Sequence, residues 1–147
     1  MNHAIEPPGL ARPSGFAYAM ECHGKLLFLS GATGQDASGR IRAKGDLVAQ
    51  FEDAITNICR VVEAAGGSPQ DVVKLTYFVR DRDEYLAKRK DIGEAYRRHF
   101  GKHYPAQSLF GITSLWEDDA LIEIEAIACI GEAPSAPLPE ETTIPGA

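Results

Sequence analysis

The chain has 147 residues with a formal net charge of −6, and 44% of them are hydrophobic and 24% charged, which is typical of a single globular domain. This composition argues against a nucleic-acid partner, because the cations gathered between residues 80 and 102 are interleaved with carboxylates and form no basic stripe. No apolar run is long enough to span a membrane and the first residues lack the pattern of a secretory signal, so we expect a cytoplasmic protein without a membrane partner.

The hydrophobic pattern predicts strands at 25–30 and 40–42, a helix at 47–65, a strand at 72–79, a helix at about 83–100, and strands at 107–112 and 121–129. Asp46 is a suitable N-cap for the first helix, and Gly66 with Gly67 ends it. The order β-β-α-β-α-β-β predicts an α+β fold in which two helices lie on one face of a sheet.

The two ends of the chain show no such pattern. Residues 1–12 contain prolines without periodicity, and we expect them to be flexible. Residues 132–147 are rich in proline and poor in large apolar side chains, which predicts a disordered tail. One domain, residues 13–131, remains between them.

One face of the predicted sheet has apolar side chains that the two helices cannot cover. Two helices cover one face, yet residues 26–29 (LLFL) are apolar toward both faces of their strand. The second face should therefore pack against another subunit. This argument predicts an oligomer and leaves the number of subunits open.

The last strand places two carboxylates on one face. Alternation puts Glu123 and Glu125 on the side opposite Ile122 and Ile124. A carboxylate in a partly enclosed cleft positions a water molecule and accepts its proton. The alternative is that both glutamates face solvent beside cationic neighbours.

Polar groups near two other strands are candidates for ligand binding. The side chains of Gln107 and Ser108 supply donors and acceptors that suit a neutral polar ligand, although Gln107 also fits an exposed strand residue. Ser30 and Gly31 follow the first strand, where a glycine lets a ligand approach the backbone; an ordinary turn is the alternative.

Cysteine and histidine residues give no site. The three cysteines are too few for a disulfide framework and lack the spacing of a zinc site. Cys59 and Cys129 lie at core positions, and the neighbours Cys22 and His23 point to opposite faces of an extended segment. We therefore expect no metal site.

The sequence resembles the Rid/YjgF family from about residue 15 to residue 130. The resemblance lies in Leu29-Ser30-Gly31, in the end of the first helix (VVEAAG, 61–66), in the strand DVVKLTYFV (71–79), in Pro105-Ala106-x-Ser108 and in IEIEAIA (122–128). It implies a chorismate-mutase-like fold with a mixed sheet and two helices, and a homotrimer whose sheets face an inner barrel, with ligand clefts between subunits.

The resemblance also implies roles for individual residues. Deaminases of this family hydrolyse 2-imino acids without a metal or cofactor, so no cofactor is expected here. A glutamate matching Glu123 orients water, and backbone groups matching Ser30 and Gly31 line the cleft. Their carboxylate-binding arginine is replaced here by Gln107. The cleft tyrosine of the family aligns with Ala17, one residue from Tyr18, and Arg89 stands where deaminases often have asparagine, so Arg89 is a candidate for the missing positive charge.

These observations predict a Rid-like protein that binds a small carbonyl, imine or enamine compound and hydrolyses it with Glu123. Without the arginine, efficient deamination of 2-imino acids is not expected, because a guanidinium binds a carboxylate through two charge-assisted hydrogen bonds and an amide does not. A non-catalytic binding or chaperone-like trimer and a true 2-iminobutanoate/2-iminopropanoate deaminase are the alternatives. An endoribonuclease, an activity attached to relatives, is disfavoured by the acidic composition.

Overall fold

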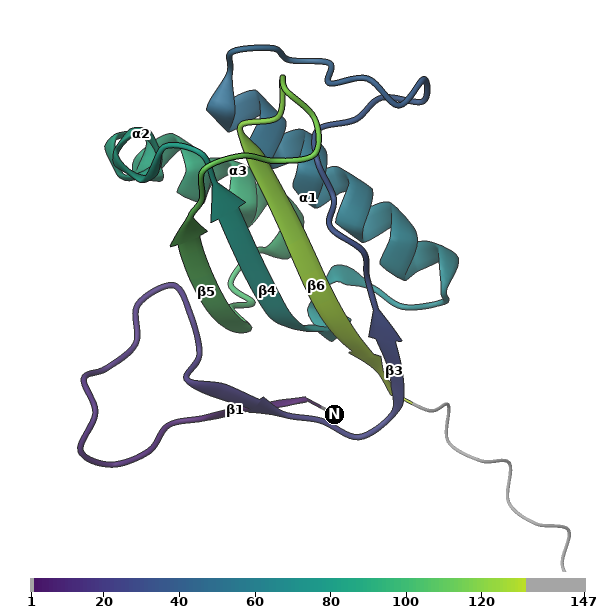
Figure 1. Ribbon diagram of the computed structural model, residues 1–147. Helices are drawn as coiled ribbons and strands as arrows, with labels where there is room; N and C mark the ends of the chain where they lie inside the picture. Colours follow the sequence, from purple (N-terminus) through teal and green to yellow (C-terminus); the bar gives the residue numbers. More distant parts are fainter. Residues whose placement is uncertain (1, 132–147) are drawn as a thin grey trace, which may run out of the picture.

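The structure is a computed structural model and describes residues 2–131. Its elements are β1 (His3–Ile5), β2 (Ala19–Glu21), β3 (Lys25–Phe28), α1 (Leu47–Ala64), the short 3₁₀ helix η1 (Pro69–Asp71), β4 (Val72–Val79), α2 (Arg82–Ala87), α3 (Arg89–Phe100), β5 (Ala106–Gly111) and β6 (Ile122–Ile130). The expected α+β fold is confirmed: α1 and α3 lie together on one face of a four-stranded sheet (Figure 1). The predicted tail, 132–147, lies outside the described residues.

The sheet is mixed, with the strand order β3-β6-β4-β5. Strand β6 runs antiparallel to both β3 and β4, whereas β5 lies parallel to β4 at the edge. The parallel pair requires a crossover, and α2 and α3 provide it on the covered face. Because β4 and β6 are central and β5 is an edge strand, residues of β5 are accessible both from the sheet face and from its border.

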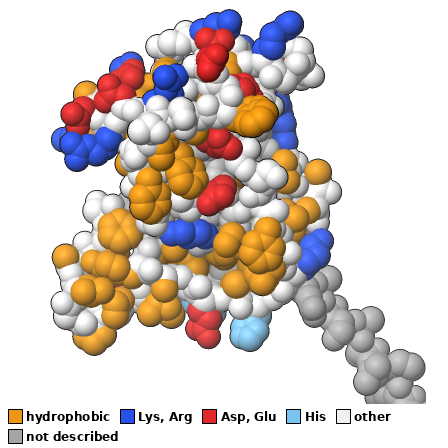
Figure 2. Space-filling model, in the orientation of Figure 1, with side chains coloured by type: hydrophobic (Ala, Val, Ile, Leu, Met, Phe, Trp, Pro, Cys, Tyr) orange, Lys and Arg blue, Asp and Glu red, His pale blue; other side chains and the backbone are white. Residues whose placement is uncertain are grey.

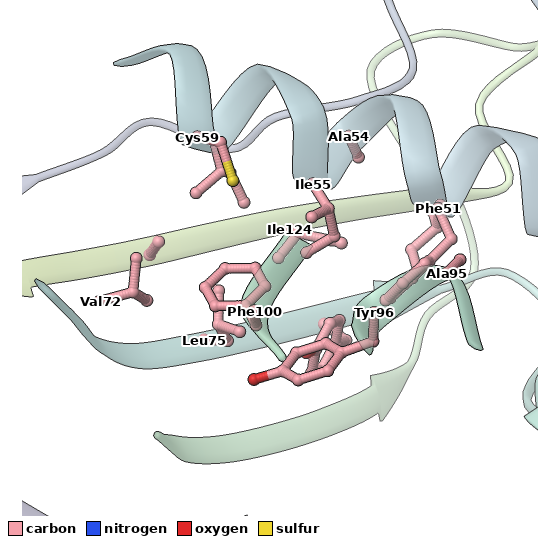
Figure 3. Close-up of a cluster of buried hydrophobic side chains, with 14 of the residues drawn as sticks. Phe51, Ala54, Ile55, Cys59, Val72, Leu75, Ala95, Tyr96, Phe100 and Ile124 are labelled. Carbon is pink, nitrogen blue, oxygen red and sulfur yellow. The ribbon is translucent and has the colours of Figure 1, made fainter. Parts of the chain in front are cut away.

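The core lies between the sheet and the two long helices. Helix α1 begins at Asp46, whose side chain accepts a hydrogen bond from the backbone N–H of Ala49 at 3.0 Å. Its apolar stripe is buried against β4, β6 and α3, and Figure 3 shows Ile55 of this stripe close to Ile124 of β6, with Phe51 further along the same helix. Each of these three side chains is at most 1% exposed. Burial on this scale is the main source of stability in a domain of this size.

The opposite face of the sheet carries uncovered hydrophobic side chains. Phe28 is 72% exposed and Phe110 is 52% exposed, although both belong to sheet strands. Figure 2 views this face and shows hydrophobic side chains gathered over the strands, with a few charged ones among them. The strand predicted at 25–30 forms β3 at the edge of the sheet. Its outer side chains are open in the single chain, because no element of the described chain packs against them.

Two predicted elements differ from the structure. The second helix is broken at Lys88 into α2 and α3, since the buried stripe of α3 starts only at Ile92 and α2 has no buried residue. The predicted strand at 40–42 is reduced to a single bridge between Gln35 and Ile41. There the side chain of Asp36 accepts hydrogen bonds from the backbone of Ser38 and Arg40, so the segment closes as a loop instead of extending.

The N-terminal residues form a hairpin that the sequence pattern did not predict. Strand β1 pairs with β2 in a separate two-stranded sheet, which lies across the lower end of β4 and β5 in Figure 1. The segment before β2 is held to the edge of the main sheet by a parallel bridge between Ala17 and Ala106, and the N–H of Ala17 donates to the carbonyl of Pro105 at 3.0 Å. This contact brings residues 12–17 against the helix-covered side of the molecule.

Candidate functional site

Strand β6 carries Glu123 on the sheet face that has no helices. Ile122 and Ile124 are fully buried on the helix side, whereas Glu123 is partly buried and Glu125 exposed on the other. The start of β6 is fixed by Gln50 of α1, a fully buried side chain whose amide oxygen accepts from the N–H of Leu121 at 2.8 Å. The alternation expected from the sequence is therefore correct, and Glu123 stands near the anchored end of its strand.

Gly31 lies directly against the carboxylate of Glu123. The segment after β3 is held to β6 by two backbone hydrogen bonds between Ala32 and Ile124, of 2.7 and 2.9 Å. A Cβ atom added to Gly31 would lie 1.9 Å from Oε1 of Glu123, so no side chain fits there while the carboxylate keeps its place. Ser30, the preceding residue, is exposed. The structure therefore brings Glu123, Gly31 and Ser30 together on the open face.

Gln107 and Ser108 point to opposite sides of β5. Ser108 is level with Thr76 on the open face, and its Oγ accepts a hydrogen bond from Nζ of Lys74 at 2.8 Å. Gln107 is level with Leu75, which faces the helices, and its Nε2 donates to the carbonyl of Gly15 at 3.0 Å. The amide of Gln107 thus helps to fix the N-terminal segment on the edge of the sheet.

A wide cleft of about 1090 Å³ opens on the Gln107 side. One wall is the N-terminal segment, with Phe16 and Ala17; the others come from β4, β5, α2 and α3 and include Arg89. Tyr18 does not line this cleft: its hydroxyl donates to the carbonyl of Ala11 at 2.7 Å and its side chain is 37% exposed. Glu123, Gly31, Ser30 and Ser108 are also absent from the lining.

Three tyrosines of the cleft have perturbed hydroxyl groups. Burial raises the pKa of Tyr85 to about 12, and burial followed by the neighbouring Tyr85 and Tyr96 raises the pKa of Tyr77 well above its ordinary value. The pKa of Tyr96 is also raised, first by burial and then by Tyr104. All three hydroxyls therefore stay protonated at neutral pH and act as hydrogen-bond donors.

Sequence reasoning missed these tyrosines and also Phe16, Gly93 and Arg97 of the cleft lining. Tyr85 and Tyr96 fall within the predicted helix at about 83–100, and helical spacing alone does not indicate a cleft. No sequence signal predicted that the N-terminal segment would fold over them. Only a long-range contact such as that of Ala17 with β5 reveals the cavity.

Among residues 2–131, no three or more His, Cys, Asp or Glu side chains are grouped in a way that could hold a metal ion. Cys59 and Cys129 are buried, as their core positions predicted. Burial raises the pKa of the Cys129 thiol to about 11, with a further contribution from a hydrogen bond with Cys22.

No helix of the described chain has the length and apolar character needed to cross a membrane.

The sequence model of the family described as endoribonuclease L-PSP matches residues 10–130. The chain belongs to the Rid/YjgF family. A RutC family protein of Pyrococcus horikoshii is 37% identical over 87% of this chain and 98% of its own length. A 2-iminobutanoate/2-iminopropanoate deaminase of Dermatophagoides farinae is 31% identical over 86% of this chain and 94% of its own.

A solved structure supports the same assignment. YyfB from Yersinia pestis, a Rid family protein of unknown function, superimposes with a TM-score of 0.78 at 31% identity and covers 88% of this chain and 98% of its own. The family resemblance found in the sequence motifs is therefore confirmed. In this chain the candidate site residues form two separate groups, one around Glu123 on the open sheet face and one around Gln107 in the cleft.

Proposed function

We propose that this Rid protein binds a small carbonyl, imine or enamine compound between subunits of a homotrimer and hydrolyses the imine form with Glu123. The observation that carries the proposal is the carboxylate of Glu123 held over the backbone of Gly31, on a sheet face that remains open. An open carboxylate beside an exposed backbone segment suits the positioning of a water molecule. The similarity to a 2-iminobutanoate/2-iminopropanoate deaminase supports this chemistry.

The proposed reaction is the hydrolysis of a C=N bond. Glu123 accepts a proton from water as the water oxygen forms a bond to the imine carbon. The nitrogen takes up both protons of that water, relayed by Glu123, which ends ionised again. The C–N bond breaks, and ammonia and a carbonyl compound leave. One water molecule is consumed for each imine, so the step needs no oxidant or reductant.

The proposal requires assembly, because in one chain the Glu123 group and the Gln107 group lie on opposite sides of the sheet. Glu123 lies on the open sheet face, whereas Gln107 and Arg89 line the cleft on the other side. The open face carries Phe28 and Phe110, which a second copy would cover. In a homotrimer, the Glu123 face of one subunit would meet the Gln107 edge of its neighbour and complete the site.

Gln107 sets the expected activity on simple 2-imino acids. Its amide is engaged by Gly15, and an amide lacks the charge and the paired donors of a guanidinium. We expect weak or no acceleration of pyruvate release from 2-iminopropanoate generated in situ, and partial recovery in Gln107→Arg. Strong turnover by the unchanged protein would favour the alternative of a true deaminase.

A non-catalytic binder is a second candidate, favoured by the fact that the cleft does not contain Glu123. The variant Glu123→Gln separates the two. If the protein is a catalyst, Glu123→Gln should abolish imine hydrolysis while ligand affinity is kept. If it is a non-catalytic binder, the unchanged protein has no hydrolytic activity and the variant keeps its ligand affinity. Glu125→Gln is the matched control, because Glu125 lies on the same face of the same strand but is exposed and not packed on Gly31. Equal loss in both variants would contradict the role of Glu123.

A further inference from the structure

The inner surface of the cleft is a row of aromatic rings. The ring centroids of Phe51 and Tyr77 are 5.9 Å apart, and those of Tyr77 and Tyr85 are 6.4 Å apart. Phe16 and Tyr96 add further rings to the lining. Distances of this size allow aromatic groups to stack or meet edge to face, so a flat apolar group has favourable positions in the cleft.

Polar atoms within this aromatic surface are left without partners. Tyr77 is only 3% exposed, and among residues 2–131 no hydrogen bond involves the hydroxyl of Tyr77 or of Tyr85. In contrast, the hydroxyl of Tyr96 donates to the carbonyl of His103 at 2.7 Å. Both hydroxyls are open to the cleft, because the buried side-chain oxygen that lacks a partner among the described residues is Oγ1 of Thr33. They can therefore donate to an acceptor on a bound molecule.

Helix α3 presents two arginines to the cleft, one turn on either side of a glycine. Arg89, Gly93 and Arg97 follow each other at intervals of four residues, and all three line the cleft. A Cβ atom on Gly93 would lie 3.3 Å from a terminal guanidinium nitrogen of Arg97, so the guanidinium lies over the glycine and toward Arg89. Gly93 provides the space that keeps this charge at the cleft.

Neither guanidinium is neutralised by the described chain. Arg89 donates to the carbonyl of Leu86 at 3.2 Å, and no ion pair within residues 2–131 involves Arg89 or Arg97. By comparison, the neighbouring Arg98 is paired with Glu52. The lining contains two acids: Asp71, which accepts hydrogen bonds from Ser68, and Glu6, which forms no ion pair with either arginine. Two unpaired guanidiniums at one cleft are well placed for an anion.

The size of the cleft favours a ligand larger than a three-carbon acid. Pockets for drug-sized ligands have volumes of roughly 300–1,000 Å³, and this cleft reaches about 1090 Å³. A three-carbon acid would leave the aromatic rings in contact with water. A ligand with a ring fills that space and removes more apolar surface from water, which is the larger part of its binding energy.

We infer that the cleft takes an aromatic 2-oxo or 2-imino acid, with the ring among Phe16, Tyr77 and Tyr85 and the carboxylate on Arg89 and Arg97. This substrate class rests on the proposed function, since it takes the cleft as the ligand-binding half of that site. The carbonyl or imine group accepts a hydrogen bond from a tyrosine hydroxyl. The two guanidiniums of α3 thus bind the carboxylate, which the neutral amide of Gln107 cannot do through charge-assisted hydrogen bonds.

Calorimetric titration of the full chain with phenylpyruvate, pyruvate and methyl phenylpyruvate tests the inference. We expect phenylpyruvate to bind about tenfold or more tightly than pyruvate, because only the former has a ring, and about tenfold or more tightly than its uncharged methyl ester. Tyr77→Phe should weaken phenylpyruvate about threefold to tenfold, since the variant keeps the ring and loses the donor.

The arginines are tested with a double variant, Arg89→Ala with Arg97→Ala. Its affinity for phenylpyruvate should fall about tenfold or more, whereas Lys90→Ala, the exposed neighbour outside the cleft, should change it less than about twofold. Equal binding of phenylpyruvate and pyruvate, or an unaffected double variant, would overturn the inference. Because binding is measured without turnover, failure of imine hydrolysis in a parallel assay would count against the proposed function alone.

Discussion

The two halves of the candidate site are built in different ways. The cleft around Gln107 and Arg89 is enclosed by elements of one chain, and Phe51 and Tyr77 in its wall are also core residues. The carboxylate of Glu123 lies on a sheet face that the chain leaves open, and one glycine, Gly31, makes room for it. The first half is tied to the stability of the monomer, whereas the second depends on local space and on assembly.

The largest expected effect is on stability in the cleft wall. Phe51→Ala removes a ring that is 1% exposed and stacked on Tyr77, and should lower the free energy of unfolding by about 3–5 kcal/mol. Urea denaturation followed by circular dichroism measures the change. Val61→Ala on the outer side of the same helix, where the side chain is 49% exposed, should cost no more than about 1 kcal/mol. Similar losses in both variants would show that the cleft wall is not part of the core.

The second prediction concerns the space beside Glu123. Gly31→Ala places a methyl group where Oε1 now lies, so the flexible carboxylate must rotate away while the fold is kept. Imine hydrolysis, measured as pyruvate release in a Gln107→Arg background, should fall about 100-fold. The melting temperature should hardly change. Gly111→Ala is the control, because its new Cβ would meet only an ordinary contact of 3.6 Å with Arg82. Undiminished activity in Gly31→Ala would show that the position of the Glu123 carboxylate does not matter for the reaction.

The third prediction tests whether the open face is covered by another copy. Phe28→Asp places a charge on a side chain that is 72% exposed in one chain and buried in the proposed trimer. The association constant, measured by sedimentation equilibrium, should fall about tenfold or more. Leu86→Asp on α2, 41% exposed and away from that face, should leave association unchanged. A wild-type chain that sediments as a monomer would refute the shared site.

The smallest effect is electrostatic and lies outside both halves. The guanidinium of Arg98 holds the pKa of Glu52 at about 2, below its ordinary 4.5. Because the folded-state pKa is the lower one, the ion pair contributes fully above about pH 4.5 and is lost as the pH falls through about 2. Glu52→Gln should therefore cost about 1 kcal/mol or less at pH 6 and much less near pH 2, as urea denaturation at both pH values would show. Glu63→Gln, an exposed change on the same helix, should show no such difference, and a constant cost for Glu52→Gln would contradict the assignment.

Most of the fold could be predicted because it follows from local periodicity. The alternation in β6 placed Glu123 and the buried Ile124 on opposite faces, and the caps of α1 fixed both its ends. The break at Lys88 was missed because helical spacing continues across it, although the buried stripe begins later. The N-terminal hairpin was missed because its position depends on contacts with β5, more than eighty residues away in the chain.

The sequence by itself determined the family, the order along the chain of the long helices and the four main strands, and the face on which Glu123 lies, since each follows from patterns within single segments. Only the tertiary structure placed the backbone of Gly31 under that carboxylate and closed the aromatic cleft over Arg89 and Arg97. Both features join segments that are distant in sequence. Their geometry is set by packing between elements, which no local pattern of residues encodes.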